Sequence, residues 1–242
     1  MNLDDKARMA RIGLDILDFA VMLTVILLLL FGGYSLFDNW NTAQQGFSPA
    51  LMQYKPDDEG SLSFNQLMSV NPDVIGWITI DQTHIDQPMV QGSNDFEYLN
   101  RNAKKEFSLS GAIFLSCENS PDFSDHYNLT YGHHMDNGGM YGDLIHFLDQ
   151  DYFDSHTTGL LTTKDGKYNL ELFAVLDTDS GNQAVYSPVQ YQQDASQLIQ
   201  YLKDNASHFR DVDPSASVLA MSTCYDAVSN GRVIVFATME KE

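Results

Sequence analysis

The chain has 242 residues, 43 % of them hydrophobic, and a formal net charge of −20 at pH 7. This length and composition suit one globular domain with a sizeable core and exclude a disordered or fibrous protein. A surface this acidic repels phosphate backbones, and no basic stripe interrupts it, which argues against a nucleic-acid partner.

The first feature along the chain is a long uncharged segment from Phe19 to Phe37. About 20 apolar residues cross a bilayer core as a helix, so residues 1–38 are predicted to be a cytoplasmic tail and a single membrane anchor. Lys6, Arg8 and Arg11 precede the segment, which predicts the N-terminus inside and the rest of the chain outside. A cleaved signal peptide is the alternative, but its apolar region is usually only about 7–15 residues long.

Residues 39–61 are polar, with Pro49, Pro56 and an acidic run, and they are predicted to form a tether. Residues 62–242 are predicted to form the folded domain, which begins with a helix over Leu62–Val70. Apolar runs bounded by turn residues then predict eight short strands. They are Trp77–Ile80, Ile85–Val90, Ala112–Leu115, Leu129–Tyr131, Leu160–Thr163, Tyr168–Leu176, Val218–Ser222 and Arg232–Thr238.

One amphipathic helix interrupts the strands. Apolar residues at Ala195, Leu198, Ile199 and Leu202 follow helical spacing and predict a helix over Gln193–Phe209. Many short strands with one such helix indicate a mainly β fold, a small closed barrel with added helices.

The two cysteines are Cys117 and Cys224, and in an exported chain the default interpretation is one disulfide. Their contexts differ, however. Cys224 ends an apolar strand, and Arg232 opens the next strand after a loop, so an antiparallel pair would bring the two residues together. A guanidinium beside a thiol favours the nucleophilic thiolate. Cys117 precedes the carboxylate of Glu118, which disfavours a thiolate, so Cys224 is the candidate nucleophile.

Seven histidines could act as the partner base. His133 and His134 follow a short strand that ends at Gly132, a position that places a side chain at a barrel mouth. Spacing does not decide between them. The other five histidines lie in polar or helical contexts and are interpreted as surface residues.

These residues together resemble the signature of the sortase family. Its marks here are Ser222-Thr223-Cys224, an arginine eight positions later at Arg232, and Tyr131-Gly132-His133 upstream. The resemblance extends over Asn71–Ile78, Ile85–Gln91, Gly111–Leu115 and Gly139–Leu144, and covers the chain from about residue 62 to the C-terminus. Within the family, the helices before the first strand and the helix before the cysteine strand are most similar to class B.

The resemblance implies an eight-stranded sortase barrel, with N-terminal helices and one long helix before the Cys224 strand. It also implies cleavage of an LPxTG-like sorting signal between Thr and Gly. Cys224 would be the nucleophile, His133 the general acid and base, and Arg232 the oxyanion or peptide ligand. Asn94, Ser222 and Thr223 match positions that bind the peptide. No calcium loop or zinc spacing is visible, and no cofactor is expected.

The expected partners are surface proteins or pilins that carry sorting signals, together with an amine acceptor, either a peptidoglycan precursor or a pilin lysine. Two other interpretations stay open. One is a hydrolytic thiol peptidase that passes the acyl group to water. The other is a non-catalytic anchored surface protein with a Cys117–Cys224 disulfide.

Overall fold

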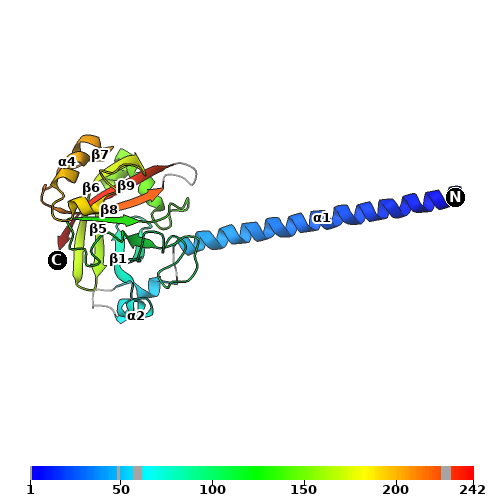
Figure 1. Ribbon diagram of the computed structural model, residues 1–242, viewed down its shortest axis with the longest axis horizontal. Coiled ribbons are helices and arrows are strands. Elements are labelled where there is room, and N and C mark those ends of the chain that lie inside the picture. Colours follow the sequence, from blue (N-terminus) through cyan, green and yellow to red (C-terminus); the bar gives the residue numbers. More distant parts are fainter. Residues whose placement is uncertain (1, 48–49, 57–61, 225–229) are drawn as a thin grey trace. The chain divides into compact units, whose positions relative to one another are not determined.

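The computed structural model describes residues 2–47, 50–56, 62–224 and 230–242, with Cys224 described by its backbone alone. The chain divides into two compact units, Met1–Thr42 and Ala43–Glu242. Every strand of the described chain belongs to the second unit (Figure 1).

Helix α1 (Leu3–Gly46) contains the predicted anchor. Within the described ranges it is the one helix long and apolar enough to cross a membrane, over Ala7–Gln44. It continues through the first residues of the predicted tether, so that part of the tether is helical. The boundaries proposed at residues 38 and 61 stay predictions.

Eight strands close into a mixed barrel. Hydrogen-bonded neighbours follow the order β5-β1-β2-β3-β4-β8-β9-β6, and pairing between β5 and β6 joins the two ends of this series. The pairs β2–β3 and β4–β8 are parallel, and the others are antiparallel. A ninth strand, β7 (His208–Phe209), pairs with β6. The predicted eight-stranded barrel is confirmed, with strands β1 (Val74–Ile80), β2 (Asp86–Val90), β3 (Ile113–Leu115), β4 (Tyr127–Tyr131), β5 (Thr158–Thr163), β6 (Gly166–Asp179), β8 (Ser217–Cys224) and β9 (Gly231–Lys241).

The central part of strand β8, Val218–Met221, is apolar because both of its faces are buried. Leu219 and Met221 belong to the core inside the barrel, whereas Val218 and Ala220 belong to a second core beneath helix α4 (Ser196–Asn205). Since successive side chains of a strand point to opposite faces, a strand between two cores reads as a continuous apolar run. Packing on both sides therefore holds the strand that ends at Cys224.

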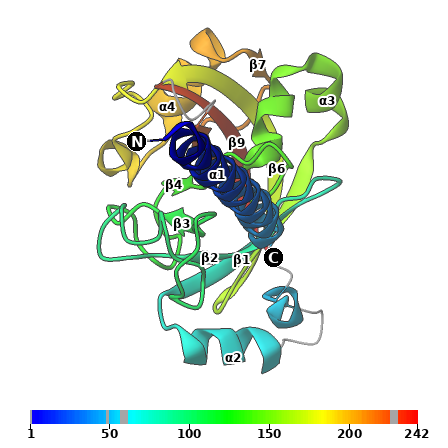
Figure 2. The ribbon, with the colours of Figure 1, turned by 90° about the vertical axis from the view of Figure 1, so that its right-hand side faces the viewer.

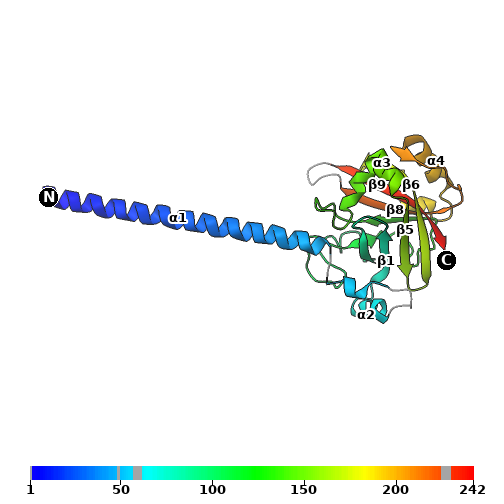
Figure 3. The same ribbon diagram turned by 180° about the vertical axis from the view of Figure 1, so that it is seen from behind.

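The helices lie around the barrel. A 3₁₀ turn η1 (Met52–Tyr54) and helix α2 (Leu62–Val70) precede β1, and α2 has the predicted bounds. Segments η2 (Gly142–Leu148) and α3 (Gln150–Ser155) follow β4, and η3 (Pro188–Tyr191) precedes α4 (Ser196–Asn205). All three views place α2 and α4 on opposite sides of the barrel (Figure 1, Figure 2 and Figure 3).

The helix predicted over Gln193–Phe209 is wrong at both ends, since α4 covers only Ser196–Asn205. At the start, the Asp194 carboxylate accepts hydrogen bonds from the backbone and hydroxyl of Ser196, a local turn that delays the helix. At the end, Ala206 is extended and Phe209 pairs with β6 as part of β7. Sheet pairing therefore overrides helical spacing, and the helix before the cysteine strand is short.

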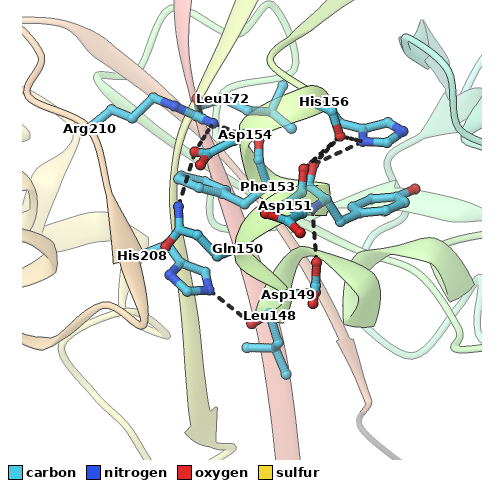
Figure 4. A network of polar contacts seen from close by, with 12 residues as sticks. Leu148, Asp149, Gln150, Asp151, Phe153, Asp154, His156, Leu172, His208 and Arg210 are labelled. Atoms are coloured by element: carbon cyan, nitrogen blue, oxygen red, sulfur yellow. Dashed lines mark hydrogen bonds and ion pairs between the residues drawn. The ribbon is translucent and has the colours of Figure 1, made fainter.

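Arg210 follows β7 and ties it to α3 and β6 (Figure 4). Its guanidinium donates to the backbone oxygens of Leu172 at 2.7 Å and Phe153 at 2.6 Å. The same group lies 3.7 Å from the centre of the Phe153 ring. Nearby, the His208 ring nitrogen Nε2 lies 2.8 Å from the Leu148 backbone oxygen. These contacts hold the helical segment after β4 against the barrel.

We expect Arg210→Ala to lower the free energy of unfolding by about 2–4 kcal/mol, because it removes charge-assisted hydrogen bonds to two carbonyls and a cation–π contact. Denaturant unfolding would measure the change. Lys203→Ala is a matched control, since Lys203 pairs with Asp211 at the surface and should matter much less. Equal destabilisation by the two variants would contradict this role for Arg210.

Candidate active site

Three strand ends meet at one end of the barrel. Strands β4 and β8 run parallel with Tyr131 opposite Ser222, and the Gly132 amide donates to the Ser222 oxygen at 3.1 Å. Strands β8 and β9 are antiparallel with Cys224 opposite Arg232. The predicted approach of Cys224 and Arg232 is thus confirmed at the backbone. The Cys224 side chain lies outside the described part of the chain.

A cavity of about 540 Å³ opens at this end of the barrel. Four of the predicted site residues line it: His133, Ser222, Thr223 and Arg232. The remaining lining residues come from β3, from β4 and from two loops, the one before β3 and the one after β6. They are Asp95, Phe96, Leu99, Phe114, Tyr131, Gly132, Ser180, Gln183 and Tyr186.

The His133 imidazole is half-buried and held by the loop before β3. Its Nε2 lies 2.8 Å from the Leu99 backbone oxygen. A carbonyl can only accept, so Nε2 carries the proton and Nδ1 is the nitrogen that exchanges a proton in the neutral ring. Gly111 borders this contact with φ +63, and a Cβ there would lie 2.7 Å from the Leu99 oxygen and 3.1 Å from the His133 ring. Glycine at 111 therefore leaves room for the oriented imidazole.

His134, the other histidine that spacing leaves open, has a different environment. Its Nε2 lies 3.3 Å from the carboxylate of exposed Asp136, and its backbone forms a bridge with Met140. It does not line the cavity within the described chain. His133 is thus the histidine that faces the cavity with Arg232.

Arg232 is half-buried at the first residues of β9. Its Nη1 donates to the Gly231 oxygen at 2.8 Å. Among the residues that the structure describes, no carboxylate lies within ion-pair distance of it. Its other N–H donors have no partner among the residues that the structure describes, which suits them to a ligand in the cavity.

Ser222 and Thr223 line the cavity with different degrees of hydrogen bonding. The Ser222 hydroxyl is 2.9 Å from the hydroxyl of Tyr186, whose ring lies parallel to that of Tyr131. The Thr223 side chain is 2 % exposed, and its hydroxyl has no hydrogen-bond partner in the described ranges. A buried hydroxyl without a partner costs about 1–3 kcal/mol, so Thr223 is suited to a hydrogen bond with a bound peptide.

Sequence reasoning missed several cavity residues, among them Asp95 and Tyr186, which come from loops and carry no periodic pattern. The neighbouring Asn94 is exposed, and its amide forms local contacts with Phe96 and Ser93. Asn94 does not line the cavity in the described chain, and its contact with a peptide stays a prediction.

Cys117 is a free, exposed thiol. The amide before it, Ser116 N, bonds to the Leu129 oxygen, and Leu129 lies opposite Ala220. Cys224 lies four residues beyond Ala220, about 13 Å along the strand, whereas a disulfide needs Cα atoms within about 7 Å. The structure therefore contradicts the Cys117–Cys224 disulfide of the non-catalytic alternative.

The environment of Cys117 disfavours its thiolate. Burial, and then the charge of Asp95, raise the pKa of the Cys117 thiol. In a Cys224→Ala chain, we expect iodoacetamide to modify Cys117 more slowly at pH 7 in the folded than in the unfolded protein, because less thiolate is present below a raised pKa. Asp95→Asn should quicken the folded reaction. Equal rates before and after unfolding would contradict the raised pKa.

A sequence model described as the sortase domain matches residues 78–240. The chain belongs to the sortase family. It is 28 % identical to Sortase B of Staphylococcus aureus over 207 residues, 84 % of each chain. It is 31 % identical to Sortase B of Listeria monocytogenes over 160 residues, 65 % of each chain.

Among solved structures, this sortase is similar to a class B sortase of Streptococcus pyogenes that is involved in pilus biogenesis. The TM-score is 0.68 and the identity 33 %, over 74 % of this chain and 98 % of that one. The chain is thus a class B-like sortase, and its barrel matches sortase B structures. As a member of this family it is a cysteine transpeptidase. The described residues contain no group of three or more His, Cys, Asp or Glu placed to hold a metal ion.

Proposed function

We propose that this sortase is anchored in the cell membrane and cleaves an LPxTG-like sorting signal outside the cell, using Cys224, His133 and Arg232. The observation that carries the proposal is the meeting of β4, β8 and β9 at one cavity, with Cys224 opposite Arg232 and His133 lining the wall. Helix α1 supplies the anchor, and the three basic residues before its apolar part favour an N-terminus inside.

The first half-reaction forms a thioacyl enzyme. The Cys224 thiolate attacks the Thr carbonyl carbon of the signal, and the carbonyl oxygen becomes an oxyanion. Arg232 donates hydrogen bonds to this oxyanion, since its guanidinium has free donors in the cavity. As the oxyanion collapses, the Thr–Gly C–N bond breaks, and the His133 imidazolium gives its proton to the departing Gly nitrogen.

The second half-reaction transfers the acyl group. An incoming amine attacks the thioester carbonyl, neutral His133 takes the proton that the amine loses, and the Cys224 thiolate leaves. The contact between Nε2 and the Leu99 oxygen keeps the imidazole oriented in both steps. The first half-reaction leaves His133 neutral, as the second requires, and the second restores the imidazolium and the thiolate for the next cycle.

The amine is either that of a peptidoglycan precursor or a lysine of a pilin. The second acceptor is supported by the similarity to the Streptococcus pyogenes sortase involved in pilus biogenesis. Water is the acceptor if the enzyme is a hydrolase. A net charge of −20 favours the approach of a cationic amine over that of an acidic acceptor.

Mass spectrometry of the full chain in detergent, incubated with an LPxTG-type peptide, tests the proposal. We expect an acyl adduct that maps to Cys224 and disappears when triglycine is added, with formation of the ligated peptide. An adduct on Cys117, or no adduct together with no cleavage, would contradict the proposed site. Release of the acyl group at a rate that ignores triglycine would instead establish hydrolysis.

A further inference from the structure

Asp95 places a carboxylate in the wall of the peptide cavity. We propose that Asp95 is a specificity residue, which favours a cationic side chain in the sorting peptide and disfavours an acidic one. This inference rests on the proposed function, since it concerns the peptide that the cavity holds. It adds a preference for the charge of one peptide side chain to the recognition of the scissile bond near Cys224.

Two neutral donors fix the Asp95 side chain. The Cys117 amide donates to Oδ1 at 2.7 Å, and the Ser116 hydroxyl donates to Oδ2 at 3.2 Å. Both donors belong to the segment directly after β3, so the carboxylate is held by the barrel rather than by its own loop. A carboxylate offers about four acceptor positions, which leaves further capacity for a ligand.

The second feature of Asp95 is its charge. No lysine, arginine or histidine of the described chain forms an ion pair with it. The negative charge of Asp95 acts on the cavity wall at Tyr131. Burial raises the pKa of the Tyr131 hydroxyl most, and the charge of Asp95 raises it further. Among the described lining residues, Asp95 is the only carboxylate and Arg232 the only lysine or arginine. The cavity is therefore negative near one residue and positive near the other.

Strand register gives the separation of these two charges along the cavity. Asp95 is held at Ser116, whose amide bonds to Leu129, and Leu129 lies opposite Ala220. Cys224 lies four residues beyond Ala220 along β8, and Arg232 lies opposite Cys224 on β9. At about 3.3 Å per residue, an extended peptide with its scissile carbonyl at Cys224 brings a side chain about four residues away to the level of Asp95. In an LPxTG-type signal the scissile carbonyl belongs to the Thr at the fourth position, so the first position, three residues before it, is the position of the motif nearest to that level.

The test uses the full chain in detergent at low salt, with LPxTG-type peptides that carry Lys, Gln or Glu at the first position. For wild type we expect kcat/KM to fall in the order Lys, Gln, Glu, with Lys over Glu on the order of tenfold. Asp95→Asn keeps the shape of the side chain and should bring this ratio to within about twofold. Asp95→Lys should reverse the order. The same three residues at the third position should show a smaller effect.

Asp165→Asn, at the tip of the β5–β6 hairpin, is the matched control and should keep the wild-type ratio. If Asp95→Lys fails to fold, Asp95→Asn alone decides. Absence of a Lys-over-Glu preference in wild type, or its persistence in Asp95→Asn, would overturn the inference while leaving the proposed function intact. Failure of all peptides to acylate Cys224 would overturn both.

Discussion

Replacing Cys224 with alanine should abolish acyl transfer, with a loss in kcat of at least ~10⁴-fold, because none of the described lining residues carries a thiol that could form the thioester instead. The matched variant Cys117→Ala should retain most of the wild-type rate, since Cys117 lies far along the barrel from Arg232 and its thiol pKa is raised. A peptide cleavage assay with triglycine as acceptor measures both variants.

Thermal unfolding of the two variants would show that the comparison is between folded proteins. Cleavage that survives in Cys224→Ala but is lost in Cys117→Ala would place the nucleophile at the other end of β4. That result would contradict the assignment of the active site to Cys224, His133 and Arg232.

Arg232→Ala should lower kcat by about 100–1000-fold, the usual effect of removing one donor to an oxyanion. Arg232→Lys should recover only part of this, because a single ammonium cannot reproduce the fork of donors that the guanidinium presents. The loss should appear mainly in kcat if Arg232 acts on the oxyanion, and mainly in KM if it only holds the peptide.

Arg101→Lys is the control for the loss of an arginine, since Arg101 is exposed and pairs with Glu97 at 3.7 Å. Its rate should stay close to wild type. Full activity of Arg232→Ala would show that the backbone pairing of Arg232 with Cys224 has no catalytic consequence.

Strands that are buried on both faces could be predicted from the sequence as apolar runs, whereas the eight-stranded barrel itself was implied by the resemblance to sortases. Residues Val218–Met221 form an apolar run with no alternation, and the structure explains this by the two cores on either side of β8. The predicted pairing of the β8 and β9 ends required only an antiparallel connection through a short loop. Strand limits were less accurate, since β6 continues to Asp179 through residues that are polar.

Most of the rest of the cavity could not be predicted, because all of its other lining residues except Phe114 and Tyr131 lie outside the strands. Asp95 follows β2 and Tyr186 follows β6, and neither position has a periodic pattern that shows which way its side chain points. The choice between His133 and His134 likewise needed coordinates, since adjacent residues differ only in direction. The end of α4 was mispredicted because pairing of Phe209 with β6 depends on a distant strand.

Closure of the barrel by β5 and β6 has a consequence for the behaviour of this protein at high local concentration. Unpaired backbone groups along a sheet margin invite neighbouring chains to add strands, which is a common beginning of aggregation. In this barrel each of the eight strands is hydrogen-bonded to a neighbour on both sides. The additional strand in the described chain, β7, is only two residues long. Together with the mutual repulsion of acidic surfaces, this leaves dense arrays of the enzyme little opportunity to associate edge to edge.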